Sequence, residues 1–361
     1  MPSIFIDAER LRNLNSGLGQ VCLHLGRELI RQRPADRPGQ AWDLTFLVPQ
    51  GRSGFFGPAV DYLEVAWHRK LWIPGRYDVW HCLHQGSVYL PRRSRLILTI
   101  YDLNFLERAD YSAAKKARRL AALQRRIDRA SLLTAGSEYT AAVVRAHLTV
   151  PATTPLTVVS TGVAVREEDA TAQAPPFLTG GDDPFLLSVG AIHPRKNLHT
   201  LLPLLGSFPA HRLVLVGPDH HPYARQLRER ARELGVADRL VMPGGVDESA
   251  KLWLYAHCEA FLFPSLSEGF GLPVVEAMVF GKPVFISRLT SLPEVGGDEA
   301  YYFQDFEPDS MARVLRDGLR DFGRDPDRAK RLRARAARFT WGNVAAQYWT
   351  LYQEVAAGRL P

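Results

Sequence analysis

The sequence predicts an α/β protein built from two Rossmann-like domains, and three observations favour this fold class. Short β-branched and aromatic runs alternate with longer helical patterns, which is typical of parallel sheets with crossover helices. The alternation stops at a polar stretch, EEDATAQAPPFLTGGDDP, and then starts again. The length of 361 residues also favours two domains over one. We therefore expect a first domain over 1–168, a linker over 169–183 and a second domain over 184–340.

The first half of the chain predicts six strands and three helices. The strands are expected at Ile4–Ile6, Leu44–Val48, Val79–Cys82, Leu96–Ile100, Leu132–Thr134 and Thr157–Val159. The helices are expected at about Gly19–Arg31, Ala113–Arg129 and Thr140–His147.

The second half repeats the pattern. Its strands are expected at Phe185–Val189, Leu213–Val216, Leu240–Met242, Ala260–Phe263, Val284–Ile286 and Tyr301–Phe303. The last segment, 341–361, contains a helical pattern that can cross back to the first domain. Ligands of such sheets bind at the carboxyl ends of the strands, so a cleft between the two domains is the expected site.

Composition and charge exclude several classes of protein. No apolar run is long enough to span a bilayer, and the start of the chain carries an acid where a signal peptide needs basic and then apolar residues. The three cysteines are far apart, which suggests neither a disulfide framework nor a zinc site. We therefore expect a cytoplasmic protein. A net charge of +7 attracts phosphates, but no nucleic-acid-binding motif is present and we expect no nucleic-acid partner.

The stretch FLFPSLSEGFGLPVVEAMVFGKPVF contains two carboxylates around a glycine loop. A buried strand ends near Pro264, the loop carries Glu268, and Pro273 suits the first turn of a short helix that contains Glu276. The loop amides and the helix N-terminus favour a diphosphate. Glu276 can accept both hydroxyls of a ribose and Glu268 those of a sugar. The alternative is that Glu276 faces solvent or pairs with an arginine.

A second stretch, SVGAIHPRKNLHTLL, follows the first strand of the second domain. Arg195 and Lys196 precede a helix for which Asn197 is the expected N-cap. Two cations beside a helix N-terminus just beyond a strand form a good diphosphate clamp. The alternative is an exposed basic loop.

The first domain carries weaker signals. Gly17 and Gly19 lie between a strand and a helix, but Cys22 stands where a dinucleotide-binding fingerprint needs its third glycine. In VWHCLHQG, strand alternation puts His81 and Cys82 on opposite faces, which argues against a shared metal. His84 follows, and we interpret it as an acceptor or phosphate contact.

The run LILTIYDLNFLE describes a buried strand that ends in Tyr101 and Asp102. At this strand end, Asp102 either holds an acceptor hydroxyl or caps the next turn.

Taken together, the motifs resemble family four of the retaining glycosyltransferases of GT-B fold, also called glycosyl transferases group 1. The segment Glu268-Gly-Phe-Gly-Leu-Pro-Val-Val-Glu276, with Gly281-Lys-Pro-Val284 after it, is similar to the paired-glutamate signature of that family. The resemblance implies that Glu276 binds the nucleotide ribose and that Glu268 contacts the donor sugar. It also implies that Arg195 and Lys196 neutralise the leaving diphosphate.

The resemblance assigns further contacts with substrates. It implies a GT-B fold, whose two Rossmann-like domains face each other across a deep cleft. The expected contacts are Gly17, Gly19, His84, Tyr101 and Asp102 in the first domain, and Gly269, Phe270, Gly271 and Leu272 in the second. Many members carry histidine where this chain has Tyr101, so Tyr101 either bonds the sugar or only packs.

The implied activity is transfer of a hexose from a GDP- or UDP-sugar to a glycan or lipid-linked acceptor, with retention and without a metal or another cofactor. Surface polysaccharide synthesis is the expected process. Two alternatives stay open: a nucleotide-sugar epimerase of the same architecture, and a non-catalytic subunit that binds sugar nucleotides.

The predicted helix over Ala113–Arg129 is strongly basic. Its seven cations are Lys115, Lys116, Arg118, Arg119, Arg125, Arg126 and Arg129. The helix is either a solvated basic face over a packed stripe, or a surface that docks on an anionic membrane where a lipid-linked acceptor waits.

Overall fold

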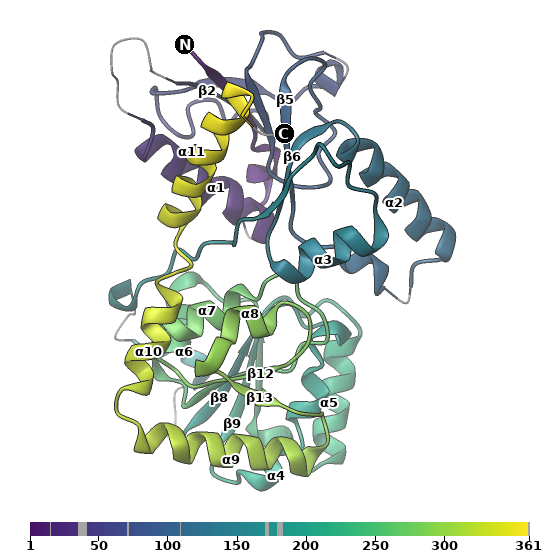
Figure 1. Cartoon of the computed structure of the whole chain (residues 1–361). Helices are drawn as coiled ribbons and strands as arrows, with labels where there is room; N and C mark the ends of the chain where they lie inside the picture. The colour runs from purple at the N-terminus through teal and green to yellow at the C-terminus, as the bar shows by residue number, and fades with distance from the viewer. Residues whose placement is uncertain are drawn as a thin grey trace. The chain divides into compact units, whose positions relative to one another are not determined.

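The computed structural model has an α/β architecture with two parallel sheets, as the alternation predicts (Figure 1). It describes residues 1–14, 16–34, 42–70, 72–108, 110–169, 173–178 and 183–359. Residues 170–172 and 179–182 of the predicted linker therefore lie outside the described residues. The chain forms two compact units, one of residues 1–162 with 340–361 and the other of residues 163–339.

Unit 1, formed by residues 1–162 and 340–361, contains a seven-stranded parallel sheet in the order β3-β2-β1-β4-β5-β6-β7. The strands are β1 Ser3–Asp7, β2 Asp43–Val48, β3 Asp61–Glu64, β4 Val79–Cys82, β5 Arg95–Ile100, β6 Ala130–Ala135 and β7 Leu156–Val158. The α-helices are α1 Gly17–Arg31, α2 Ala113–Ile127, α3 Glu138–His147 and α11 Trp341–Ala357. The sequence missed β3, because an edge strand of sequence DYLE has no apolar run.

Unit 2, residues 163–339, contains a six-stranded parallel sheet in the order β10-β9-β8-β11-β12-β13. The strands are β8 Phe185–Val189, β9 Arg212–Val216, β10 Leu240–Gly244, β11 Ala260–Phe263, β12 Val284–Ser287 and β13 Tyr301–Phe303. The α-helices are α4 Leu204–Ser207, α5 Tyr223–Glu233, α6 Glu248–His257, α7 Leu272–Val279, α8 Leu292–Gly296, α9 Pro308–Arg324 and α10 Arg328–Ala336.

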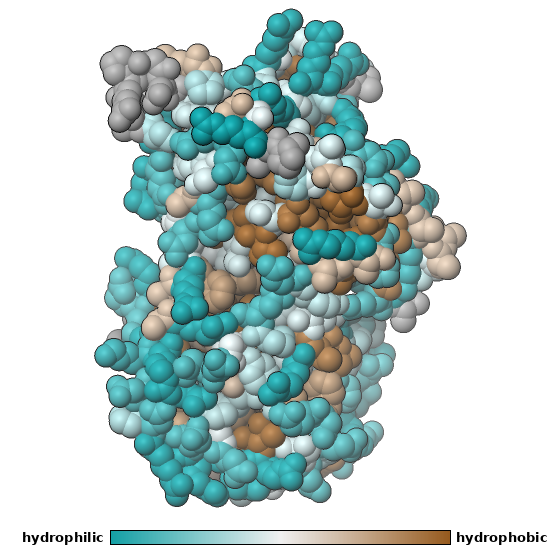
Figure 2. Space-filling model, viewed as in Figure 1, coloured by the Kyte–Doolittle hydropathy of each residue, from teal (hydrophilic) through white to brown (hydrophobic). Residues whose placement is uncertain are grey.

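Each sheet of both units is covered on both faces, so its strands are almost continuously buried. In unit 1, Ile4 and Ile6 point into the core beneath α1 and α11, while Phe5 points to the opposite face. Strand alternation separates them in this way. None of the described helices is both long and apolar enough to cross a bilayer. Figure 2 shows a mostly hydrophilic face on which apolar residues gather around α3.

The last helix, α11, belongs to unit 1 although it follows the whole of unit 2 in sequence. It packs against α1, and the indole of Trp349 donates to the carbonyl of Leu29 at 3.1 Å (Figure 1). Its polar side chains also enter the core. Tyr352 bonds His81 Nδ1 at 2.7 Å, and Tyr348 bonds Thr99 at 3.0 Å.

This buried network extends across three neighbouring strands, β4, β5 and β6. His81 Nε2 lies 2.8 Å from Thr99 Oγ1, which lies 2.8 Å from Thr134 Oγ1. All five side chains, including those of Tyr348 and Tyr352, are almost completely buried. Burial lowers the pKa of His81 to about 3, so its ring is neutral. Every polar group of this network has a neutral partner, which is the condition for a buried polar cluster to stabilise a fold.

Candidate functional site

The candidate site of unit 2 begins where β8 ends. After Val189, the chain turns through His193 into a 3-10 turn, Pro194–Lys196, and His193 Nδ1 accepts from the amide of Arg195 at 3.2 Å. Asn197 follows in the left-handed region with φ of 57°. The expected helix N-cap is wrong, because Asn197 makes no side-chain cap and lies between two 3-10 turns. The amide nitrogen of its buried side chain has no hydrogen-bond partner among the described residues.

The loop after β11 brings Glu268 to this turn. Lys196 Nζ lies 2.6 Å from Glu268 Oε1, and Arg195 lies 2.9 Å from Glu268 Oε2. The Lys196 ammonium also lies 4.4 Å from the centre of the Phe263 ring. The side chains of Lys196 and Glu268 are about 90% buried, whereas that of Arg195 is 32% exposed. Two cations therefore share one carboxylate in a largely buried place.

The pKa values of both buried groups in this cluster are lowered. Burial opposes ionisation of Glu268, but Lys196 and Arg195 outweigh it and hold the pKa of Glu268 below its usual value. Burial lowers the pKa of Lys196, and the positive charge of Arg195 adds to this effect. The single carboxylate of Glu268 therefore offsets the effect of burial on the Lys196 ammonium only in part. The cluster has an excess of positive charge, and an anion bound there would be stabilised.

The loop that carries Glu268 is held from a neighbouring strand end. The Glu268 amide donates to Thr290 Oγ1 at 3.0 Å, and Ser291 Oγ donates to the carbonyls of Glu268 and Phe270 at 3.0 and 2.9 Å. Thr290 has a φ of 57°, which is strained for a β-branched residue. Thr290 and Ser291 were missed in the sequence, although polar residues just after β12 were a signal.

The helix α7, Leu272–Val279, starts at the end of the same loop. Its N-cap is Gly271, with φ of 115°, and Pro273 lies in its first turn as predicted. Because Gly271 has no side chain, no side chain caps the N-terminus of α7. The positive end of the helix dipole of α7 faces the loop that carries Glu268. Phe270 points into the core instead, where its ring packs edge-on against Phe339. Gly269 and Leu272 flank this turn, and Leu272 packs against the core.

Glu276, one turn into α7, has partners from α6. Its Oε2 accepts from the Tyr255 hydroxyl at 2.7 Å, and its Oε1 lies 3.5 Å from Lys251 Nζ. Neither partner was predicted, and a lysine and a tyrosine four residues apart on α6 were the available signal. Burial opposes the charge of Lys251, but Glu276 and Glu248 outweigh it and raise its pKa. Glu276 is therefore a fixed carboxylate whose side chain stays 17% exposed.

The candidate residues of unit 1 follow the carboxyl ends of β1, β4 and β5. Gly17 and Gly19 open α1, whose N-cap Ser16 accepts from the amide of Gly19 at 3.1 Å. A side chain at Gly19 would lie 1.9 Å from the carbonyl oxygen of Asn13, so only glycine fits there. Space is open around Gly17. The glycines thus serve two purposes, close packing at Gly19 and an open approach at Gly17.

His84 is buried, with 1% of its surface exposed, and it contacts protein groups. Its Nδ1 accepts from the Gly86 amide at 3.1 Å, and its Nε2 lies 3.4 Å from Glu9 Oε1 and 3.3 Å from Arg10 Nε. The hydrogen bond with His84 lowers the pKa of Glu9. Glu9 and Arg10 were missed in the sequence. Their side chains are more exposed than that of His84.

Tyr101 and Asp102 follow β5. The ring of Tyr101 packs against the core beneath α1 and α11, and burial raises its pKa well above the usual value. Asp102 Oδ1 accepts from the Asn104 amide at 3.1 Å, which caps the turn that follows. In this structure Tyr101 packs and Asp102 caps the turn, and their contacts with a substrate stay predictions.

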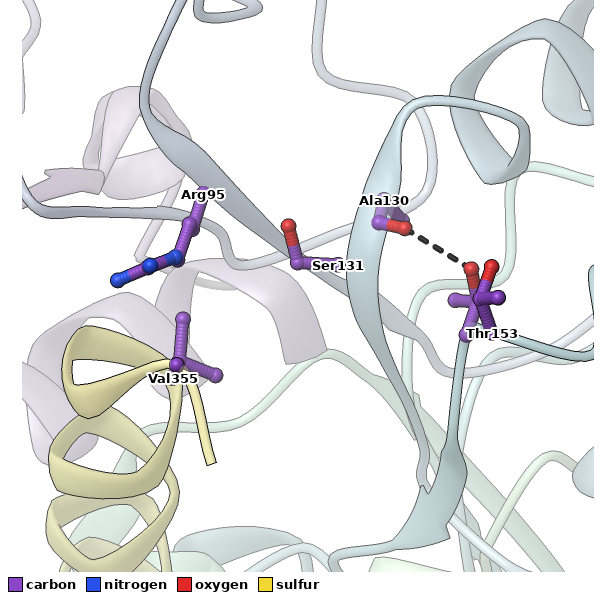
Figure 3. Close-up of a pocket in the computed structure, with 7 residues that line it drawn as sticks. Arg95, Ala130, Ser131, Thr153 and Val355 are labelled. Carbon is purple, nitrogen blue, oxygen red and sulfur yellow. Dashed lines mark hydrogen bonds between the residues drawn. The ribbon is translucent and has the colours of Figure 1, made fainter. Parts of the chain in front are cut away.

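A cavity of about 370 Å³ lies in unit 1 at the end of the sheet opposite to the candidate residues (Figure 3). It is lined by Arg95, Ala130, Ser131, Thr153, Thr154, Val355 and Gly358. Arg95 and Ala130 are the first residues of β5 and β6, so the cavity lies at the amino ends of these strands. Ligands of such sheets bind at the carboxyl ends, and this cavity contains none of the candidate residues.

Comparison with known proteins agrees with the motifs of unit 2. Residues 169–339 match the family described as Glycosyl transferases group 1. The chain is 33% identical over 169 residues to the serotype-specific mannosyltransferase WbdA of Escherichia coli, and it spans about a fifth (21%) of the length of that relative. It is 28% identical to the O-antigen chain mannosyltransferase B of Escherichia coli, over 75% of this chain and 73% of the relative.

The fold agrees with a solved structure over almost the whole chain. Sucrose-phosphate synthase from Thermosynechococcus elongatus superposes with a TM-score of 0.76, over 99% of this chain and 100% of that one. The two sequences are 19% identical, so this likeness shows the fold and nothing finer.

Proposed function

The chain belongs to the glycosyl transferases group 1 family through residues 169–339, and we propose that it transfers a sugar from a nucleoside diphosphate sugar to a glycan or lipid-linked acceptor. Unit 2 would bind the donor and unit 1 the acceptor. The observation that carries this proposal is the pair of cations on one carboxylate, Lys196 and Arg195 against Glu268. This excess positive charge lies beside the uncapped N-terminus of α7, and both features favour a diphosphate.

The cluster suits departure of a nucleoside diphosphate. As the bond between the sugar C1 and the phosphate oxygen breaks, its electron pair leaves with the diphosphate, and negative charge grows on the phosphate oxygens. Arg195 and Lys196 would stabilise that charge without a metal ion. The acceptor hydroxyl then attacks C1 from the face the diphosphate left and gives its proton to a phosphate oxygen. The anomeric configuration is retained.

Each glutamate would have a separate task. Glu268, held by two cations and by Thr290, would accept hydrogen bonds from hydroxyls of the donor sugar. Glu276, held by Tyr255 and Lys251, would accept both hydroxyls of the nucleotide ribose. The resemblance implies these roles for the same two positions, and the partners found here hold both carboxylates in place.

The relatives suggest which sugar to test first. Both relatives named above are mannosyltransferases, and one acts on the O-antigen chain. We therefore propose a hexose donor, mannose before others, carried by GDP or UDP, and a role in surface polysaccharide synthesis. We place the protein in the cytoplasm, with peripheral contact to the anionic inner face of the membrane.

The test is transfer from labelled GDP- and UDP-hexoses to glycan and lipid-linked acceptors, with and without a chelator. Labelled glycan or lipid whose new linkage has the anomeric configuration of the donor supports the proposal, and the chelator should leave the rate unchanged. Conversion of the donor into its epimer without acceptor would make the protein an epimerase. Binding of sugar nucleotides without turnover of any donor would make it a non-catalytic subunit.

A further inference from the structure

The segment between β3 and β4 of unit 1 exposes two large aromatic side chains. Trp67 is 78% exposed and Trp72 is 60% exposed. The chain has seven tryptophans. Four of the others, Trp42, Trp80, Trp341 and Trp349, are buried in unit 1, and Trp253 is half-buried in unit 2. Indoles left in water lose the stabilisation that burial gives the other five.

Basic residues lie close to these two indoles in sequence. Trp67, His68, Lys70, Trp72 and Arg76 are all exposed, and we call these five residues the tryptophan surface. The sequence from Val65 to Tyr77 contains no aspartate or glutamate. The surface therefore combines amphipathic rings with positive charge alone.

The backbone beneath the tryptophan surface is held in place. Trp67–Lys70 forms a 3-10 turn, and the amide of Trp72 donates to the carbonyl of His68 at 3.1 Å. Ile73 and Tyr77 pack against the core on the face of the sheet that also carries α2, and the Tyr77 ring lies 5.2 Å from that of Phe5. The two indoles project from an anchored segment.

We propose that the tryptophan surface docks unit 1 on an anionic lipid bilayer. Indole rings favour the headgroup level, where the ring meets apolar chains and its N–H meets water. Cations on the same surface attract anionic lipid, and a reversible anchor needs two such signals. This inference rests on the peripheral membrane contact of the proposed function and names the residues that make it. Its test uses no transferase activity, so the two can fail separately.

The basic helix α2 fits this role less well. Arg126 donates to the carbonyl of Ser87 at 2.9 Å, and Arg129 donates to that of Pro91. Lys115 lies 3.5 Å from the centre of the Tyr111 ring. These cations already have partners within the protein, and the exposed stretch of α2 has no tryptophan. Of the two surfaces, only the tryptophan surface combines exposed tryptophans with exposed cations.

The experiment measures binding of the full chain to vesicles and the emission of its tryptophans. With vesicles of 30% phosphatidylserine in phosphatidylcholine, we expect cosedimentation and a shift of the emission to shorter wavelength. Trp67→Phe with Trp72→Phe should abolish the shift, because the other five indoles are already shielded. Trp67→Ala with Trp72→Ala should lower partitioning at least about tenfold. Pure phosphatidylcholine should bind little.

Charge is tested by a matched pair of variants. Lys70→Gln with Arg76→Gln should lower partitioning roughly twentyfold, because each cation near an anionic surface contributes on the order of a fivefold change in affinity. Arg225→Gln with Arg320→Gln removes the same charge from exposed positions of unit 2 and should leave partitioning unchanged. Circular dichroism and the melting temperature show that each variant is folded.

Three outcomes would overturn the proposal. Equal binding of the wild type and the alanine variant to anionic vesicles would place the membrane contact elsewhere. Loss of vesicle binding in Arg118→Gln with Arg125→Gln would place that contact on α2. No binding by the folded wild type would exclude a bilayer. Quenching of Trp67 and Trp72 by oligosaccharides, without vesicle binding, would show that the tryptophan surface holds sugar rings.

Discussion

Both units bury polar side chains near the centre of a parallel sheet, but they do so differently. In unit 1, His81 lies between Thr99 and Tyr352, and every member of the network is neutral. In unit 2, the buried group consists of Lys196 and Glu268, with Arg195 at its edge, and every member is charged. The first network joins a helix to three strands, and the second joins two loops at strand ends.

We infer from this difference that the unit 1 network is structural and that the unit 2 cluster binds a ligand. Donors and acceptors of the unit 1 network satisfy one another, so nothing outside the protein is needed. The unit 2 cluster carries two positive charges against one negative charge, which costs stability unless an anion completes it. Buried charge in excess at the carboxyl end of a sheet indicates a ligand, and a buried neutral network indicates packing.

The largest expected effect is on the turnover rate, which should depend on the unit 2 cluster. Lys196→Ala should lower turnover roughly a hundredfold or more, because the leaving diphosphate loses a preorganised cation. Arg195→Ala should act in the same direction. The measurement is steady-state kinetics with the donor identified by the transfer assay, and Lys330→Ala, on an exposed face of α10, is the control. Turnover within twofold of the wild type in Lys196→Ala would make the cluster structural.

A second effect is expected on binding. Glu276→Gln should weaken nucleoside diphosphate binding by about 1–3 kcal/mol, because a neutral amide cannot accept both ribose hydroxyls. Isothermal calorimetry with the free nucleoside diphosphate measures it. Tyr255→Phe removes the partner of Glu276 but keeps the charge, and should cost less affinity. An unchanged affinity in Glu276→Gln would contradict the ribose role.

The sequence predicted the skeleton of the fold because that skeleton follows from local patterns. The helical pattern predicted within 341–361 is the helix α11, Trp341–Ala357, and both sheets are parallel. The motifs also predicted that Arg195, Lys196 and Glu268 lie at strand ends, where the structure brings them together. Periodicity and turn chemistry are properties of neighbouring residues, so one sequence suffices for them.

Contacts between distant segments could not be predicted in the same way. Tyr255 binds Glu276 and Thr290 binds Glu268 across 21 and 22 residues of chain. The burial of His84 depends on Glu9 and Arg10, 75 and 74 residues away. Side-chain partners of this kind are fixed by packing between elements, which local propensity does not describe.

The pH dependence of stability sharpens the comparison further. The pKa of His81 is about 3 in the folded chain and about 6.5 when unfolded, so between these values the unfolded state binds more protons. Stability should therefore fall as pH falls below 6.5, by up to about 1.4 kcal/mol per pH unit. Burial raises the pKa of Asp7, which acts in the opposite direction at acid pH. In His81→Gln, the free energy of unfolding measured with urea between pH 7 and 5 should no longer show this slope.

The last expected effect concerns Tyr352 alone. Tyr352→Phe removes the hydroxyl that bonds His81 Nδ1 and leaves one buried polar atom without a partner. Unfolding free energy should fall by about 1–3 kcal/mol, most of it from the unpaired imidazole nitrogen. Nucleotide affinity should not change, because the residues that we propose to bind the nucleotide lie in unit 2. Urea denaturation and calorimetry on the same preparation measure both quantities, with Tyr139→Phe, whose hydroxyl bonds Glu107 at the surface, as the control. A loss of nucleotide affinity without a loss of stability would reverse the assignment of the two clusters, making the neutral network functional.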